Sequence, residues 1–99
     1  MRYYFGWDPK KAIDNIKKHK ISFERAAGIF IDPRAITIFD RGHSESEDRW
    51  ITMGIDGSGV LLVVAHTFKE MDNNRHEVRL ISARKATKKE AKQYLEENI

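Results

Sequence analysis

The segment from residue 43 to residue 49 reads HSESEDR and carries side chains suited to acid–base chemistry. His43, Glu47 and Arg49 place an imidazole, a carboxylate and a guanidinium group in one polar loop. A histidine beside a carboxylate can act as general base and general acid, or the two can bind a metal ion. The spacing matches no metal-binding motif. The alternative is a solvated acidic loop in which Arg49 pairs with Glu47.

A second histidine, His66, stands with Thr67 at the polar end of an apolar run, residues 60–65. A histidine in that position must form hydrogen bonds or reach a cleft, because an unpaired buried imidazole is costly. His66 is therefore a candidate acid or base. A hydrogen-bonded histidine with a purely structural role is the alternative.

Arg79 and Arg84 lie on the extended segment that follows a polar turn at residues 69–74. Arg79 falls between apolar neighbours, an unfavourable place for a permanent charge unless an anion lies opposite. A phosphate group fits this role, because the guanidinium fork matches its geometry. An ion pair of Arg79 with Glu47 or Glu77 is equally compatible with the sequence.

A metal-independent ribonuclease would use this set of side chains. Such an enzyme needs a base for the 2′-hydroxyl group, an acid for the leaving oxygen and cations for the extra charge on the phosphorane. Two basic runs, within residues 17–20 and 84–92, favour a polyanionic ligand, although lysine runs often serve only solubility. The side chains alone do not identify the reaction.

The composition is that of one small domain spanning residues 1–99. Hydrophobic residues make up 40% of the chain and the formal net charge is +3, a mildly basic balance compatible with a nucleic-acid partner. The absence of cysteine excludes disulfides and thiolate zinc sites. No apolar run reaches the roughly 18 residues of a membrane span, and no signal-peptide pattern occurs, so we expect a cytoplasmic protein without a membrane partner.

Helix caps and apolar periodicity predict a helical hairpin after a short aromatic strand at residues 3–7. Asp8 caps a first helix with Pro9 at its first position, and Ser22 caps a second helix, which ends before Pro33. The expected inward faces of the two helices are Ala12, Ile13 and Ile16, and Phe23, Ala26, Ala27 and Phe30.

The rest of the chain predicts an antiparallel meander followed by a helix. The expected strands cover residues 35–39, 49–56, 60–65 and 75–83. The third is wholly apolar, so it should be central and buried on both faces, while Val78, Leu80 and Ser82 should share one face of the fourth. A capping box at Thr87 and Glu90 begins the final helix. The predicted fold class is α+β: an antiparallel sheet of about four strands with an N-terminal helical hairpin and a C-terminal helix.

Four motifs, in this order, resemble the BrnT family, the toxins of bacterial type II toxin–antitoxin pairs. The N-terminal motif FGWDPKKAIDNIKKHKISFERAAGIFIDP matches the family at Trp7, Asp8, Lys11, Asn15, Lys18, His19, Ser22, Phe23, Ala26, Asp32 and Pro33. The loop HSESEDRW matches it at His43, Ser44, Glu47 and Arg49. The strand VLLVVAHTF and the C-terminal segment VRLISARKATKKEAKQY match the other two motifs.

This resemblance implies a small ribonuclease of RelE-like fold that inhibits translation and needs no metal or other cofactor. It also implies a cognate antitoxin with its own DNA-binding domain, with which the toxin forms a hetero-oligomer. A toxin that binds a protein such as gyrase, and a non-catalytic partner-binding module, are the alternatives, because a fold does not fix a function.

The resemblance also suggests residue roles. His66 would be the acid or base, with Arg79 and Arg84 stabilising the phosphorane. Glu47 and Arg49 would complete the cleft. The expected RNA contacts are Lys18, His19, His43, Thr67, Lys85 and Lys88.

Two residues depart from the family pattern. Leu80 replaces a usual isoleucine, and Lys20 replaces a glycine that suits a left-handed helix C-cap. A distorted turn is therefore expected at Lys20.

Overall fold

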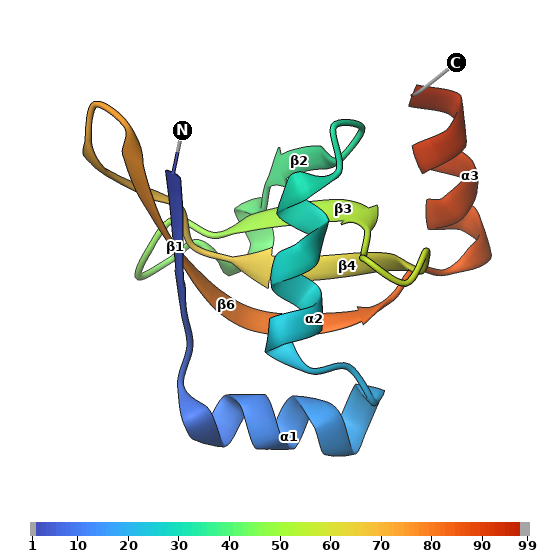
Figure 1. Ribbon diagram of the computed structural model, residues 1–99, viewed down its shortest axis with the longest axis horizontal. Helices are drawn as coiled ribbons and strands as arrows, with labels where there is room; N and C mark the ends of the chain where they lie inside the picture. The colour runs from blue at the N-terminus through green and yellow to red at the C-terminus, as the bar shows by residue number, and fades with distance from the viewer. Residues whose placement is uncertain (1, 98–99) are drawn as a thin grey trace.

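In the computed structural model, residues 2–97 form one mixed β-sheet with helices on both sides (Figure 1). Within these residues the elements are β1 (Arg2–Gly6), α1 (Pro9–His19), α2 (Phe23–Ala27), β2 (Ile36–Phe39), β3 (Trp50–Ile55), β4 (Leu61–His66), β5 (Lys69–Asp72), β6 (Arg75–Lys85) and α3 (Lys88–Glu97). Two 3₁₀ turns follow α2 and β2, at Gly28–Ile31 and Arg41–His43. None of the helices in this part of the chain is long and apolar enough to cross a membrane.

The sheet differs from the prediction in strand number and direction. Its order is β1-β6-β4-β3-β2, with β5 also paired to β6, so the described residues contain six strands instead of four. β1 runs parallel to β6, whereas the other pairs are antiparallel. The helices explain this, because α1 and α2 carry the chain from β1 at one edge to β2 at the other. The predicted four-stranded antiparallel sheet is therefore wrong, and the α+β class is correct.

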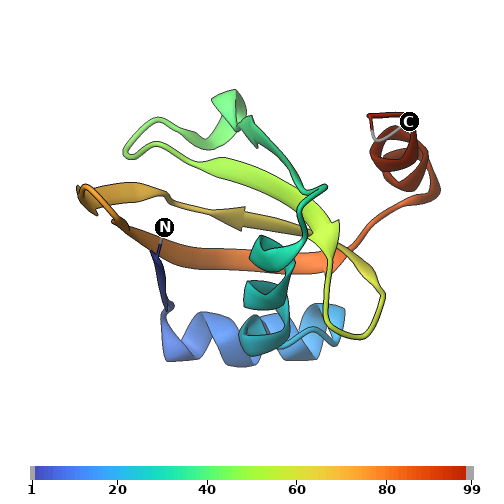
Figure 2. The ribbon, with the colours of Figure 1, turned by 45° about the horizontal axis from the view of Figure 1, so that its top comes forward.

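α1 and α2 cover one face of the sheet, and α3 lies on the opposite side (Figure 2). The larger core lies beneath α1 and α2 and consists of Ile21, Phe23, Ala26, Ile29, Leu62, Val64, Val78, Leu80 and Ala83. On the other face, Met53, Val63 and Tyr94 form a smaller cluster against α3. Tyr94 also donates a 2.6 Å hydrogen bond to Asp32 Oδ2, which fastens α3 to the turn before β2.

β4 is the central strand that its apolar run predicts, since it pairs with β3 on one side and β6 on the other. Two features of the strands that follow β4 differ from the prediction. Residues 69–72, expected in a turn, form β5, so that only residues 73–74 make the turn. The pairing of β4 with β6 is irregular, and Ala83 instead of Ser82 therefore shares the buried face with Leu80.

The predicted helix starts are confirmed. Asp8 and Ser22 each accept a hydrogen bond from a backbone N–H in the first turn of their helix. Thr87 and Glu90 form the capping box, with reciprocal hydrogen bonds of 2.9 and 3.2 Å. The second helix is shorter than expected, because after Ala27 the chain continues as a 3₁₀ turn.

The inward face of α1 is polar at its centre, contrary to the predicted apolar stripe. Ile13 and Ile16 are 55% and 46% exposed, whereas Asn15 is buried. Asn15 Nδ2 donates to the carbonyl oxygens of Ile21 (2.9 Å) and Ala83 (2.8 Å), and its Oδ1 accepts from Ala83 N (3.1 Å). Because β1 pairs only with residues 75–79 of β6, Asn15 satisfies the backbone of β6 beyond the end of β1.

Lys20 ends α1 in the left-handed conformation, with φ of 62°, and its N–H donates to Ile16 O. The turn keeps the C-cap geometry, so the expected distortion is absent. A β-carbon makes this conformation unfavourable by about 1–2 kcal/mol. Glycine avoids this cost, but it loses more backbone entropy on folding, which offsets part of the gain. We expect Lys20→Gly to raise the free energy of unfolding by about 0.5–1 kcal/mol in urea denaturation. Lys18→Gly, within α1, should lower it, and a loss of stability in both variants would contradict this account.

Candidate active site

Both predicted arginines of β6 lie on the face of the sheet that α1 and α2 leave uncovered. Val78 and Leu80 belong to the core beneath the helices, so Arg79 between them points to the opposite face. After the irregular pairing, Ala83 is buried on the helix side and Arg84 points away from it.

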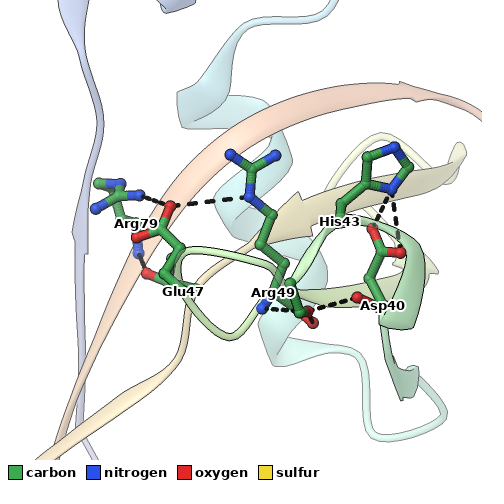
Figure 3. Close-up of polar contacts among 7 residues, drawn as sticks. Asp40, His43, Glu47, Arg49 and Arg79 are labelled. Atoms are coloured by element: carbon green, nitrogen blue, oxygen red, sulfur yellow. Dashed lines mark hydrogen bonds and ion pairs between the residues drawn. The ribbon is translucent and has the colours of Figure 1, made fainter.

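Glu47 connects two predicted site residues in a chain of ion pairs (Figure 3). Arg79 Nη2 donates to Glu47 Oε1, and Arg49 Nε lies 3.8 Å from the same oxygen. Among the alternatives for Arg79, the pair with Glu47 is the one present. Thr67 lies at the same place, since its Oγ1 accepts a 3.3 Å hydrogen bond from Arg79 N. One carboxylate between two guanidinium groups leaves net positive charge for an anionic ligand.

His43 is oriented by a carboxylate that precedes it in the loop. Its Nδ1 lies 3.0 and 3.2 Å from the two side-chain oxygens of Asp40 (Figure 3). Because a carboxylate only accepts, this contact favours a proton on Nδ1 and leaves Nε2 free to act as a base. The His43 side chain is 70% exposed. Ser44 holds the loop, donating to Asp40 O and accepting from Arg49 N.

His43, Arg49 and Arg84 line one cleft of about 270 Å³. The other residues of its lining are Asp40, Ile51, Val63, Ala65, Ile81 and Ser82. Within residues 2–97 the buried Nε of Arg49 forms no hydrogen bond and has only a 3.8 Å ion pair with Glu47, while the Arg49 side chain is 28% exposed, so its guanidinium group can meet an incoming anion. The cleft thus combines an imidazole, which can take a proton, with two cations, which can stabilise negative charge on a phosphate, as phosphoryl transfer requires.

Arg84 is held at the rim of this cleft by a bidentate ion pair with Glu90. The two nitrogen–oxygen distances are 2.7 and 2.9 Å. This hydrogen-bonded pair lowers the pKa of Glu90 to about 2 and raises the pKa of Arg84 above its usual value. Glu90 therefore both caps α3 and fixes a guanidinium group of the site.

The Arg84–Glu90 pair makes stability depend on pH. Because the folded pKa of Glu90 is depressed, its stabilisation is complete above the ordinary value of 4.5 and is lost as the pH falls toward about 2. We expect Glu90→Gln, which can still cap the helix, to reduce the acid-induced fall in the free energy of unfolding. Denaturation series across this range measure the effect, with Glu24→Gln at an exposed position of α2 as control. An unchanged pH dependence in Glu90→Gln would contradict the contribution of this pair.

His66 does not reach these arginines. It points to the helix side, is 1% exposed, and its ring lies 5.0 Å from that of Phe30. Its Nδ1 lies 2.9 Å from Thr67 O and its Nε2 2.6 Å from Thr52 Oγ1, so both ring nitrogens are occupied. Burial lowers the pKa of His66, which favours the neutral ring. This geometry favours a structural histidine over a role as acid or base.

The predicted RNA-binding cations lie at two separate places. Lys18 and His19 belong to the last turn of α1, on the covered side of the sheet. Lys85 and Lys88 lie where β6 ends and α3 begins, and they follow Arg84 closely in the chain. Only the second pair is close in the chain to a residue of the cleft, and neither pair is part of its lining.

Asp40 is the site residue that sequence reasoning missed. The sequence holds a signal for it, because a carboxylate three residues before a loop histidine can reach the imidazole ring, but the family motif of this loop begins only at His43. Its contact with His43 is an isolated pair: the part of the chain that the structure describes holds no group of three or more His, Asp or Glu side chains placed for a metal ion.

Comparison with known proteins agrees with the resemblance. The family model described as "Ribonuclease toxin, BrnT, of type II toxin-antitoxin system" matches residues 7–90. Among solved structures, the chain is similar to the 1.1 Å crystal structure of the Brucella abortus ribonuclease toxin, BrnT. The TM-score is 0.60 at 21% identity, over 89% of this chain and 100% of that chain, a likeness that concerns the fold. The search of curated proteins gave no match.

The family match includes the loop with His43, the central strand and both arginines of β6. It therefore covers the cleft and the elements that build it. On this basis the chain belongs to the BrnT family, the ribonuclease toxins of type II toxin–antitoxin systems.

Proposed function

We propose that this toxin cleaves RNA in the cleft lined by His43, Arg49 and Arg84, without a metal ion. The observation that carries the proposal is an imidazole, oriented by Asp40, in one cleft with two guanidinium groups. His43 Nε2 takes the proton of the RNA 2′-hydroxyl, whose oxygen attacks the adjacent phosphorus. The bond to the 5′ oxygen breaks and this oxygen is protonated by water, which leaves a 2′,3′-cyclic phosphate and a 5′-hydroxyl end.

The arginines supply the electrostatic stabilisation of the phosphorane. Arg49 is positioned by the 3.8 Å ion pair of its Nε with Glu47, and Arg84 is preorganised by Glu90. Cations held in place before the reaction stabilise developing charge without reorganisation. Arg79 and Thr67 lie beside the cleft and hold the RNA backbone in this proposal, and Glu47 is a positioning residue between Arg79 and Arg49.

The partner follows from the family, whose toxins have a cognate antitoxin. We infer that this antitoxin carries a DNA-binding domain and forms a hetero-oligomer with the toxin in the cytoplasm, where its RNA substrate is found. Residues 1–99 would act as a single domain in that complex.

Cleavage of a defined RNA by the purified chain, with EDTA present, tests the proposal. We expect cleavage that EDTA leaves unchanged and that the cognate antitoxin suppresses. RNA that stays intact, together with inhibition of a protein target such as gyrase by the same preparation, would contradict it.

Arg49→Ala should slow cleavage about 10²–10³-fold, because it removes a preorganised donor to the phosphorane. Arg49→Lys should recover only part of the rate, since a lysine lacks the fork that binds two phosphate oxygens. Single-turnover cleavage rates measure both effects. Arg75→Ala, which removes a guanidinium group paired with Asp72 in the β5–β6 hairpin, is the matched control. Equal rates for Arg49→Ala and Arg75→Ala would argue against a role of the cleft.

A further inference from the structure

A second cavity, of about 370 Å³, opens on the helix side of the sheet, on the face opposite the cleft. Four aromatic rings line it, those of Tyr3, Phe30, Trp50 and Phe68. The centroid of the Tyr3 ring lies 5.8 Å from that of Phe30 and 6.2 Å from that of Phe68. Tyr3 and Phe68 are exposed although apolar rings would gain from burial. The cavity thus offers aromatic faces to a flat ligand.

The polar groups of this cavity form a hydrogen-bond chain with a fixed direction. Thr67 O can only accept, so the proton of His66 is on Nδ1 and its Nε2 is an acceptor. Thr52 Oγ1, 2.6 Å from that Nε2, must then donate to it. Thr37 Oγ1, 2.8 Å from Thr52 Oγ1, in turn donates to Thr52. The lone pairs of the exposed Thr37 hydroxyl therefore remain free, and the cavity presents an acceptor.

The cavity is adjacent to the proposed catalytic cleft through the backbone of two strands. Arg49 lines the cleft and the next residue, Trp50, lines the cavity. At the end of β4, Thr67 is bonded to Arg79 and the next residue, Phe68, lines the cavity. Because consecutive strand residues point to opposite faces, the cavity and the cleft lie on opposite sides of the sheet and come together where β3 begins and β4 ends. An RNA strand that passes this end of the sheet can contact Arg49 and Arg79 on one face and place a neighbouring base in the cavity on the other.

We infer that this aromatic cavity is a base-binding subsite, which stacks an unpaired RNA base and accepts an N–H of its edge at Thr37. The inference rests on the proposed function in one respect, the RNA strand that delivers the base. Stacking on aromatic side chains is how proteins bind splayed bases, and an acceptor at the edge selects bases with a donor there. The adjoining arginines favour RNA over an aromatic side chain of a protein partner, because that partner would bring no phosphate for them.

Nucleosides test the subsite independently of cleavage, because they lack the phosphate that the cleft would bind. The chain has two tryptophans, and Trp7 packs against Phe23 in the core, so Trp7→Phe leaves Trp50 as the fluorescent reporter. In this variant we expect saturable quenching by adenosine, and weaker binding of N6,N6-dimethyladenosine, whose amino group donates no hydrogen bond. Absence of saturable quenching by all four common nucleosides would overturn the inference.

Thr37 provides the matched pair of variants. Thr37→Val removes the acceptor and should weaken adenosine binding about tenfold, whereas Thr37→Ser keeps a hydroxyl and should bind like the parent. Thermal unfolding checks that both variants fold. Equal affinity of Thr37→Val and the parent for adenosine would overturn the role of the acceptor.

The results separate this inference from the proposed function. Adenosine binding by a chain that leaves RNA intact would support the subsite and contradict the proposed cleavage. RNA cleavage with no nucleoside binding would support the proposed cleavage and overturn the subsite. Quenching of Trp50 by the antitoxin and by none of the nucleosides would assign the cavity to a protein partner and overturn the inference.

Discussion

Replacing His43 with glutamine is expected to slow RNA cleavage about 10²–10⁴-fold, because it removes the base for the 2′-hydroxyl. Glutamine is similar in size to histidine and can still hydrogen-bond to Asp40, so the loop should keep its shape. Single-turnover cleavage of a short RNA by purified protein measures the loss. Asp40→Asn should give an intermediate rate, since it retains the imidazole and weakens its orientation.

His19→Gln is the control for this substitution. His19 lies at the end of α1, on the side of the sheet away from the cleft, so its replacement should leave the rate unchanged. His66→Gln should lower stability, because it disturbs a buried hydrogen-bond chain, and the folded fraction should still cleave RNA. A His43→Gln variant as active as the parent would contradict the assignment of the base.

The largest expected effect on stability comes from Asn15. Asn15→Leu leaves the carbonyl groups of Ile21 and Ala83 and the N–H of Ala83 without their partner in a buried environment. Each such group costs about 1–3 kcal/mol, so we expect a loss of about 3–5 kcal/mol in the free energy of unfolding. Urea denaturation followed by circular dichroism measures it.

Asp14→Leu makes a similar change at the neighbouring, exposed position of α1 and should alter the free energy of unfolding by less than about 0.5 kcal/mol. Asn15→Asp should be intermediate, because it keeps an acceptor for Ala83 N and loses both donors. If Asn15→Leu were as stable as Asp14→Leu, the amide could not be what joins α1 to β6.

Local signals in the sequence predicted the local structure well. The caps at Asp8 and Ser22, the capping box at Thr87 and the apolar run of β4 are properties of a few adjacent residues, and all four are present. The parallel pairing of β1 with β6 could not be predicted in this way. It depends on where α1 and α2 carry the chain, and residues 2–6 carry no sign of their partner.

The burial of Asn15 shows the same limit within a helix. An asparagine beside Ile16 is expected on the exposed side of an amphipathic helix. β1, however, ends halfway along β6, so within residues 2–97 the backbone of β6 at Ala83 has no strand partner on that side and is bonded by the Asn15 amide instead. Tertiary hydrogen bonds therefore outweighed the apolar periodicity of α1.

For the site, the sequence identified the loop with His43, Glu47 and Arg49, and the structure places all three on the uncovered face or at its edge. The face of the sheet on which His66 lies could not be predicted from the sequence, because strand alternation alone does not say which face the helices cover. The register of the β4–β6 pairing also shifts beside His66, which no sequence motif predicts. Because of this shift, Arg84 points to the cleft.

The chemical nature of the RNA ends tests the central claim, that His43 activates a 2′-hydroxyl in a metal-free cleft. The chain would cut a short RNA in EDTA, and mass spectrometry would identify the new ends. The account predicts a 2′,3′-cyclic phosphate and a 5′-hydroxyl, and no cleavage where a 2′-deoxynucleotide precedes the scissile phosphate. Products with a 3′-hydroxyl and a 5′-phosphate, or cleavage after the 2′-deoxynucleotide, would contradict it.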